Sequence, residues 1–135
     1  MFGYRFTTAH GISMEPTLSN GDMIWLKFID VVDIRVGDIV TLSTPEEGSV
    51  THRVINVQAL PQDGYLIETR GDANWPSEQW EINANETVPV FVARTPFAGS
   101  VVDFLSSVLG RALLITLAVA TVVAMWVRRR RVKQM

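Results

Sequence analysis

An uncharged apolar run near the carboxyl end is the strongest constraint on how this 135-residue chain can fold. Residues 112–127 contain no charged side chain. Extended back through Leu109 and Gly110, with the Arg111 side chain reaching the membrane interface, the run comes close to the ~20 residues that a bilayer-spanning helix needs. Trp126 stands where interfacial aromatic residues are common, and a basic cluster follows it. We therefore expect a transmembrane helix over residues 112–127, in preference to a buried helix of a soluble protein.

Charge divides the chain into an acidic body and a basic end. The formal net charge is −2, but residues 1–110 hold fourteen acidic and six basic residues, a net −8. The tail, residues 128–135, carries only basic charge. Basic residues beside a membrane helix stay in the cytoplasm, so we expect a cell-membrane protein with a cytoplasmic tail and an extracytoplasmic acidic body. An acidic body also argues against nucleic acid as a partner.

Short β-branched and aromatic runs, separated by turn residues, fill the acidic body. The expected strands are residues 4–9, 23–28, 38–43, 50–57, 65–69 and 88–93. No stretch between Gly11 and Pro96 has helical periodicity. We expect a mainly β fold, a small coiled domain or incomplete barrel over residues 1–100, joined to the helix by a juxtamembrane segment over 101–111. Residues 1–12 hold no long apolar run, so neither a signal peptide nor a membrane helix is expected there.

Cofactor chemistry has no sequence support in this chain. There is no cysteine, which excludes disulfides and thiolate metal sites. The sequence also lacks a glycine-rich phosphate loop and any cluster with metal-ligand spacing. We therefore expect no cofactor and no metal.

A serine lies in a stiff, apolar-flanked segment with the sequence Gly11-Ile12-Ser13-Met14-Glu15-Pro16-Thr17-Leu18. Pro16 fixes its own φ angle and has no backbone donor, which stiffens the segment. A stiff backbone suits a nucleophile, because the hydroxyl must be aimed at its target. A lone serine is more often solvated or a helix cap, so Ser13 becomes a candidate only together with the residues around it.

Four stretches, in order along the chain, resemble the type I signal peptidases. They are Ser13-Met14-Glu15-Pro16-Thr17-Leu18, Gly37-Asp38-Ile39-Val40, Thr51-His52-Arg53-Val54 and Thr69-Arg70-Gly71-Asp72-Ala73-Asn74. A histidine at His52, where other members have lysine, resembles the endoplasmic-reticulum and archaeal branch, which also occurs in some Gram-positive bacteria (SipW-like). The resemblance implies a signal-peptidase-like fold and a membrane-anchored serine endopeptidase. Its substrates would be precursor proteins, cut after small residues to remove their signal peptides.

The implied chemistry needs a base and a group that orients the base. A serine hydroxyl is a weak nucleophile near neutral pH, and His52 is the candidate base because histidine changes charge in that range. A third group should hold the imidazole, and Glu78 and Asp72 both remain candidates. In the resembled branch the assisting acid lies near the place of Glu78 and is usually an aspartate. His10, the other histidine, is expected to be structural or adjacent to substrate.

On the side of the site that would bind substrate, the sequence departs from the resembled pattern at two residues. The resemblance implies a small hydroxyl residue two places before the nucleophile and a glycine just before it, but Gly11 and Ile12 stand there. The backbone N–H of Ser13 is then the candidate donor to the oxyanion. An extended peptide is expected to pair with a strand edge, in residues 6–11 or part of 38–43.

Two alternatives remain open at this point. The first is a specialised processing peptidase for pilin, coat or matrix precursors. The second is an inactive, membrane-anchored β-module that binds peptides, which Gly11, Ile12 and Glu78 would favour. Self-cleaving repressors have a similar β-fold and serine but use a lysine base and a DNA-binding domain, so His52 and the membrane helix argue against that class.

Overall fold

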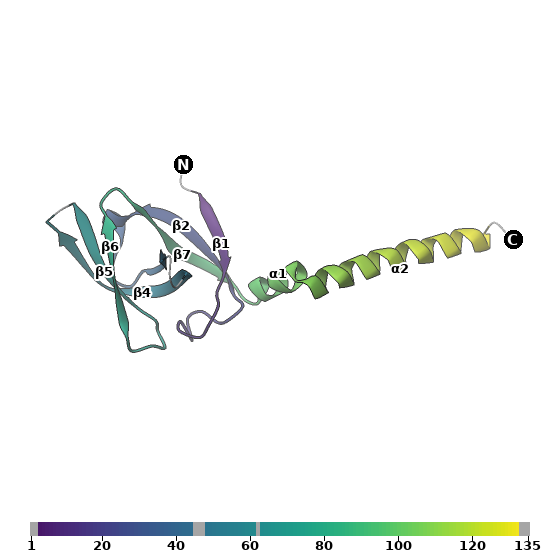
Figure 1. Ribbon diagram of the computed structural model, residues 1–135, viewed down its shortest axis with the longest axis horizontal. Coiled ribbons are helices and arrows are strands. Elements are labelled where there is room, and N and C mark those ends of the chain that lie inside the picture. Colours follow the sequence, from purple (N-terminus) through teal and green to yellow (C-terminus); the bar gives the residue numbers. More distant parts are fainter. Residues whose placement is uncertain (1–2, 45–47, 62, 133–135) are drawn as a thin grey trace. The chain divides into compact units, whose positions relative to one another are not determined.

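Seven antiparallel strands form the amino-terminal part of the computed structural model, which describes residues 3–44, 48–61 and 63–132 (Figure 1). The chain divides into two compact units, residues 1–100 and 101–135, which we describe one at a time. The strands are β1 (Tyr4–Thr8), β2 (Met23–Asp30), β3 (Ile39–Thr44), β4 (Gly48–Leu60), β5 (Gly64–Arg70), β6 (Ser77–Asn83) and β7 (Thr87–Thr95), with a short 3₁₀ turn, η1 (Val31–Asp33), after β2.

The seven strands form one sheet in the order β1-β2-β7-β3-β4-β5-β6. Figure 1 shows the strands curving around a common interior, as in an incomplete barrel, with β1 and β6 at the two edges. The prediction of a mainly β fold is confirmed, and each of the six expected strands is present within a few residues.

Alternating burial explains why these segments are strands. In β2, Ile24 and Leu26 are buried while Trp25 and Lys27 are exposed, which is the period of two that a half-buried strand requires. The buried side chains form two clusters, and each fully buried aliphatic side chain stabilises the fold by about 1.5–3 kcal/mol. One cluster centres on Val31, Val54 and Ile67. The other joins Met14 and Leu18 to Ile24, Leu26 and Ile39.

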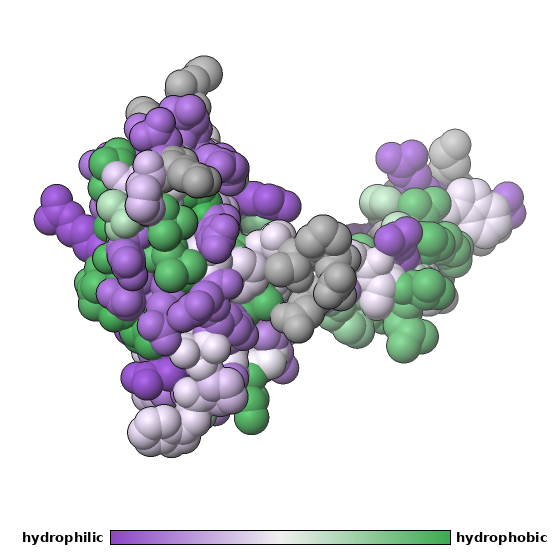
Figure 2. Space-filling view, turned by 60° about the vertical axis from the view of Figure 1, so that its left-hand side comes forward, coloured by the Kyte–Doolittle hydropathy of each residue, from purple (hydrophilic) through white to green (hydrophobic). Residues whose placement is uncertain are grey.

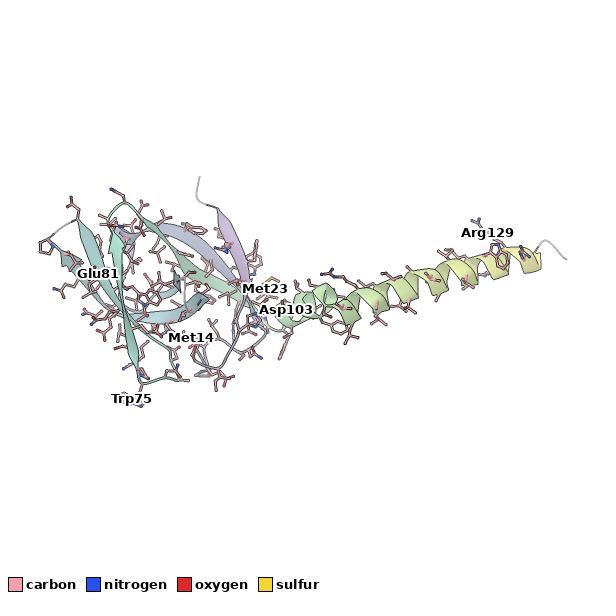
Figure 3. The ribbon with its side chains drawn as sticks, in the orientation of Figure 1. Met14, Met23, Trp75, Glu81, Asp103 and Arg129 are labelled. Atoms are coloured by element: carbon pink, nitrogen blue, oxygen red, sulfur yellow. The ribbon has the colours of Figure 1, made fainter. Side chains whose placement is uncertain are left out.

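Strand β6 was not predicted from the sequence. Only Trp80 and Ile82 supply apolar side chains, and the other residues are polar types that rarely favour strands. Pairing with β5 along the whole strand forms β6, and the Trp80 indole N–H donates to the Thr69 hydroxyl at 2.8 Å. The loop before β6 carries Trp75, whose ring projects away from the sheet (Figure 3).

Two helices follow the sheet: α1 (Ala98–Ser106) and α2 (Val108–Val132). Helix α1 was not expected: it begins within the residues assigned to the β-domain and continues into the predicted juxtamembrane segment. Ser107 caps α2, because its hydroxyl accepts from the Gly110 N–H at 3.1 Å. A side chain at Gly110 would lie 2.0 Å from the Phe104 carbonyl oxygen, so glycine permits the close approach of the two helices.

Helix α2 is the one helix of the described residues that is long and apolar enough to cross a bilayer, over residues Val108–Arg130. Apolar residues predominate along it in Figure 2. It begins before the expected residue 112 and ends beyond 127, because a helix continues through polar flanks where the backbone bonds are satisfied. By length and composition, this supports a C-terminal membrane segment, and its orientation remains a proposal.

Candidate active site

Ser13 lies in a loop of residues 9–22 between β1 and β2, which we call the nucleophile loop. Two tight turns shape it: the Glu15 N–H donates to the Ile12 carbonyl at 3.1 Å, and the Leu18 N–H donates to the Met14 carbonyl at 2.9 Å. Met14 and Leu18 are buried in the second core cluster, while Ser13 between strand and turn stays half-exposed. The apolar residues of the loop therefore anchor it, and the hydroxyl is left accessible.

His52 lies on β4 and meets Ser13 across the fold. Its Nε2 lies 3.2 Å from the Ser13 hydroxyl oxygen, and its Nδ1 lies 3.0 Å from Oε2 of Glu78 on β6. The His52 side chain is 8% exposed and the Glu78 side chain 36%. Because a carboxylate can only accept a hydrogen bond, His52 Nδ1 carries a hydrogen and donates it to Glu78. The unprotonated Nε2 can then accept a hydrogen bond from the Ser13 hydroxyl.

The sheet register explains why Glu78 reaches His52. His52 and Val54 are buried residues two apart on β4, so they share one face of the sheet. Thr69 on β5 lies opposite both Val54 and Glu78. Residues directly opposite each other face the same side, so Glu78 shares the face of His52 although it lies two strands away.

Asp72, the other candidate orienter, lies in a separate cluster. Its carboxylate accepts from Arg53 Nε at 2.8 Å, from Arg53 Nη2 at 2.7 Å and from the Thr17 hydroxyl. Arg53 also donates to the Gly37 carbonyl at 2.9 Å. The structure thus brings Ser13, His52 and Glu78 together, and it places Asp72 where it ties the nucleophile loop to β4. Sequence reasoning missed this tie, although Arg53 directly follows His52 and so must face the opposite side.

The hydrogen bonds from Arg53 hold the pKa of Asp72 below its ordinary value, and the Thr17 hydroxyl adds to this while burial opposes it. A lowered folded pKa stabilises the protein above the unfolded pKa of about 3.9, and this stabilisation is lost as the pH falls through the folded pKa. We expect Asp72→Asn to lower the free energy of unfolding by about 1–3 kcal/mol at pH 7. Urea unfolding should show the difference from wild type shrinking toward pH 3. A difference that stayed constant from pH 7 to pH 3 would contradict the role of this ion pair.

Gly71, just before Asp72, lies against both Ser13 and His52. A β-carbon added there would lie 2.6 Å from the Ser13 carbonyl oxygen, 3.1 Å from Ser13 Cβ and 3.2 Å from His52 Nε2. The neighbouring Ala73 N–H donates to the same Ser13 carbonyl at 2.8 Å. Glycine at residue 71 therefore permits Ser13 and His52 to lie where they do, and a side chain there would displace one of them.

We expect Gly71→Ala to lower kcat for peptide cleavage about 100-fold, because displacing a reacting group by about 1 Å can cost that much. Gly3→Ala is the control, since a β-carbon at Gly3 meets nothing within 4 Å. Thermal unfolding of both variants separates misplacement from loss of the fold. Full activity of a folded Gly71→Ala protein would show that the approach is not critical.

The backbone conformation of the loop explains why a glycine stands two places before Ser13. Gly11 has φ of +91°, which residues with a side chain rarely adopt. Its N–H donates to the Asn20 side-chain oxygen at 3.2 Å. A hydroxyl residue at this place would be strained, so the departure from the resembled pattern follows from the shape of this loop.

A cleft of about 270 Å³ opens beside Ser13. Residues 7–9, at and just after the end of β1, form one wall, and residues 49–51 near the start of β4 form another. His10 and Gly11 also line the cleft. The expectation of an edge at β1 agrees with the sheet order. Residues 38–43 do not line this cleft. Strand β3 pairs with β4 along its length but with β7 only at Val40, so an open edge in part of 38–43 stays a prediction.

Within the described residues, no group of three or more histidine and acidic side chains could hold a metal ion. Ser13, His52 and Glu78 form a hydrogen-bonded line, and the sequence predicted these three residues as nucleophile, base and orienting acid.

The chain is similar to the protein named Signal peptidase I W of Bacillus subtilis (strain 168), with 35% identity over 75 residues. This similarity supports the signal peptidase family. The matched region is 55% of this chain and 39% of that protein, so the chain spans well under half the length of this relative. No protein-family model matches the chain, and no solved structure matches it.

Proposed function

We propose that this chain is a membrane-anchored serine endopeptidase of the SipW-like branch, which removes signal peptides from exported precursors. The observation that carries the proposal is the line from Ser13 through His52 to Glu78, with separations of 3.2 Å and 3.0 Å. These three residues come from the nucleophile loop, β4 and β6, and no local sequence pattern would bring them together by itself. The similarity to a signal peptidase over 75 residues supports the same reaction class.

The geometry suggests roles for each group. Ser13 attacks the scissile carbonyl while its proton passes to His52 Nε2, and the Ser13 N–H donates to the developing oxyanion. Glu78 stabilises the imidazolium, which then protonates the leaving amine. A water molecule, deprotonated by His52, attacks the acyl-enzyme and releases Ser13. In this scheme Asp72 holds the loop and does not touch the base.

The proposed substrate is an extended peptide in the cleft beside β1. An edge strand offers unpaired backbone groups, so peptide binding gives affinity through the main chain. The cleft walls are small or moderately sized residues, among them Thr7, Ala9 and Thr51, which suits small residues near the cut. Helix α2 would hold the site beside the bilayer from which such a precursor emerges, and its tethering would raise the effective substrate concentration.

The proposed topology follows from charge. Residues 128–130 are arginines at the end of α2, and Arg130 lies 3.8 Å from the centre of the Trp126 ring. Basic residues and an interfacial aromatic at the same helix end favour a cytoplasmic carboxyl terminus. The sheet domain would then lie outside the cytoplasm.

A serine-reactive acylating inhibitor tests the proposal together with cleavage of a precursor peptide. We expect labelling of Ser13 and cleavage by wild type, loss of both in Ser13→Ala, and retention of both in Ser106→Ala, an exposed serine in α1. A folded wild-type protein that formed no adduct would instead favour the anchored peptide-binding module. A panel of precursors would then distinguish general signal-peptide removal from specialised processing.

A further inference from the structure

The nucleophile loop is closed at its neck by backbone hydrogen bonds. The Ala9 N–H donates to the Asp22 carbonyl, and the Gly21 N–H donates to the Ala9 carbonyl, both at 2.8 Å. The side chain of Asn20 adds its bond to Gly11. These hydrogen bonds join the two ends of the nucleophile loop to each other, and none of them involves Ser13 itself.

Asp22 places a carboxylate inside this neck. Its side chain is 2% exposed, and it accepts from Arg94 Nη1 at 2.7 Å, from the Ser19 N–H at 3.1 Å and from the Phe97 N–H at 3.4 Å. Burial alone would raise the pKa of Asp22, but these hydrogen bonds hold the pKa below its ordinary value. A buried charge needs such partners, and removing one leaves it uncompensated.

The residues that begin α1 lie directly on the same neck. The Ser100 N–H donates to the Gly21 carbonyl at 3.0 Å. A β-carbon at Gly99 would lie 2.5 Å from Thr8 Cγ2 and 2.9 Å from the Gly21 carbonyl oxygen. Glycine at residue 99 thus permits the start of α1 to lie against both Thr8 at the end of β1 and Gly21 in the neck.

Resting on the function proposed above, we propose that Asp22 is a positioning residue for Ser13. It fastens the neck of the nucleophile loop, through Arg94 and the Phe97 N–H, to the segment that begins α1. The aim of the Ser13 hydroxyl toward His52 then depends on a carboxylate that touches neither residue. Nothing in the mechanism above uses Asp22, and its burial with three donors is explained by this role.

Arg94→Gln is the main test, because the Arg94 side chain is 38% exposed and the glutamine amide can still donate to the buried Asp22 carboxylate, so the protein should stay folded. We expect kcat for a precursor peptide to fall roughly 10–100-fold, since a loosened loop misaims the nucleophile, while KM changes less than about threefold. Arg94→Lys, which keeps the charge, should restore part of kcat. Gly99→Ala perturbs the same neck from the α1 side and should also lower kcat, whereas Gly3→Ala should not.

Amide hydrogen exchange gives a readout that does not need activity. In Arg94→Gln we expect the Ala9 and Gly21 amides to exchange at least about tenfold faster than in wild type, with β4 and β5 amides unchanged. Unchanged exchange at the neck, or a fall in kcat that matches a general loss of thermal stability, would overturn the inference. Wild type that neither cleaves a precursor nor takes up an acylating inhibitor at Ser13 would contradict the proposed function instead, and the exchange result would still decide on the neck.

Discussion

Replacing His52 by alanine is expected to lower kcat for precursor cleavage by roughly 10⁴–10⁶-fold, the range found when the base of a serine triad is removed. The hydroxyl of Ser13 then has no acceptor at 3.2 Å for its proton. The fold should survive, because the Glu78 side chain is 36% exposed and water can solvate it once the imidazole is gone. Single-turnover cleavage of a peptide, with thermal unfolding of the same samples, measures both quantities.

His10→Ala is the matched control for this experiment. His10 lines the same cleft but lies on the loop before Ser13 and is not placed at the Ser13 hydroxyl in the proposed mechanism. We expect it to change kcat less than about tenfold, with any effect falling on KM. Retained cleavage by a folded His52→Ala protein would remove His52 from the mechanism, whatever the result for His10.

Glu78→Gln is expected to lower kcat by roughly 10²–10⁴-fold, and Asp72→Asn by less than about tenfold. An amide at residue 78 can donate to Nδ1, which favours the tautomer with a proton on Nε2 and so removes the acceptor for Ser13. The lower end of the range reflects the partial exposure of Glu78, because a water molecule could accept the hydrogen bond from His52 Nδ1 in its place. The effect of Asp72→Asn should appear mainly in stability, since its carboxylate contacts Arg53 and Thr17.

The comparison between these two variants identifies the orienting acid. A larger kcat loss in Asp72→Asn than in Glu78→Gln would assign the role to Asp72 and contradict the geometry-based choice. Glu78→Asp is a useful third variant, since an aspartate is usual at this place in the resembled branch. A shorter side chain that kept more than about a tenth of the activity would indicate that the loop and β6 adjust to restore the contact.

Much of the sheet followed from alternation, because strands with one buried face repeat every two residues. Strand β6 was not predicted because it lacks this alternation signal. Only Trp80 and Ile82 are apolar, so its own sequence has little preference for a strand, and pairing with β5 decides its conformation. Glu78 could be proposed from the family resemblance, but the strand that carries it could not be predicted.

The partners of the candidate site were harder to predict than its residues. The resemblance identified Ser13 and His52, and their side chains lie at hydrogen-bond distance, although their catalytic roles stay predictions. The choice between Glu78 and Asp72 needed the sheet register, since a turn residue such as Asp72 can face either way. The same holds for Gly11, whose positive φ is a property of the folded loop and leaves no mark in the sequence beyond the glycine itself.

The outermost position of β6 in the sheet has a consequence for how activity depends on temperature. An edge strand is bonded along one side only, so its end frays before the interior strands do, and Glu78 lies one residue from the end of β6. Under the proposed mechanism, warming should therefore separate Glu78 from His52 while Ser13 and His52 remain in contact. The temperature of half-maximal activity would then fall below the melting temperature of the sheet, and a ligand that added a strand beside β6 would bring the two temperatures together.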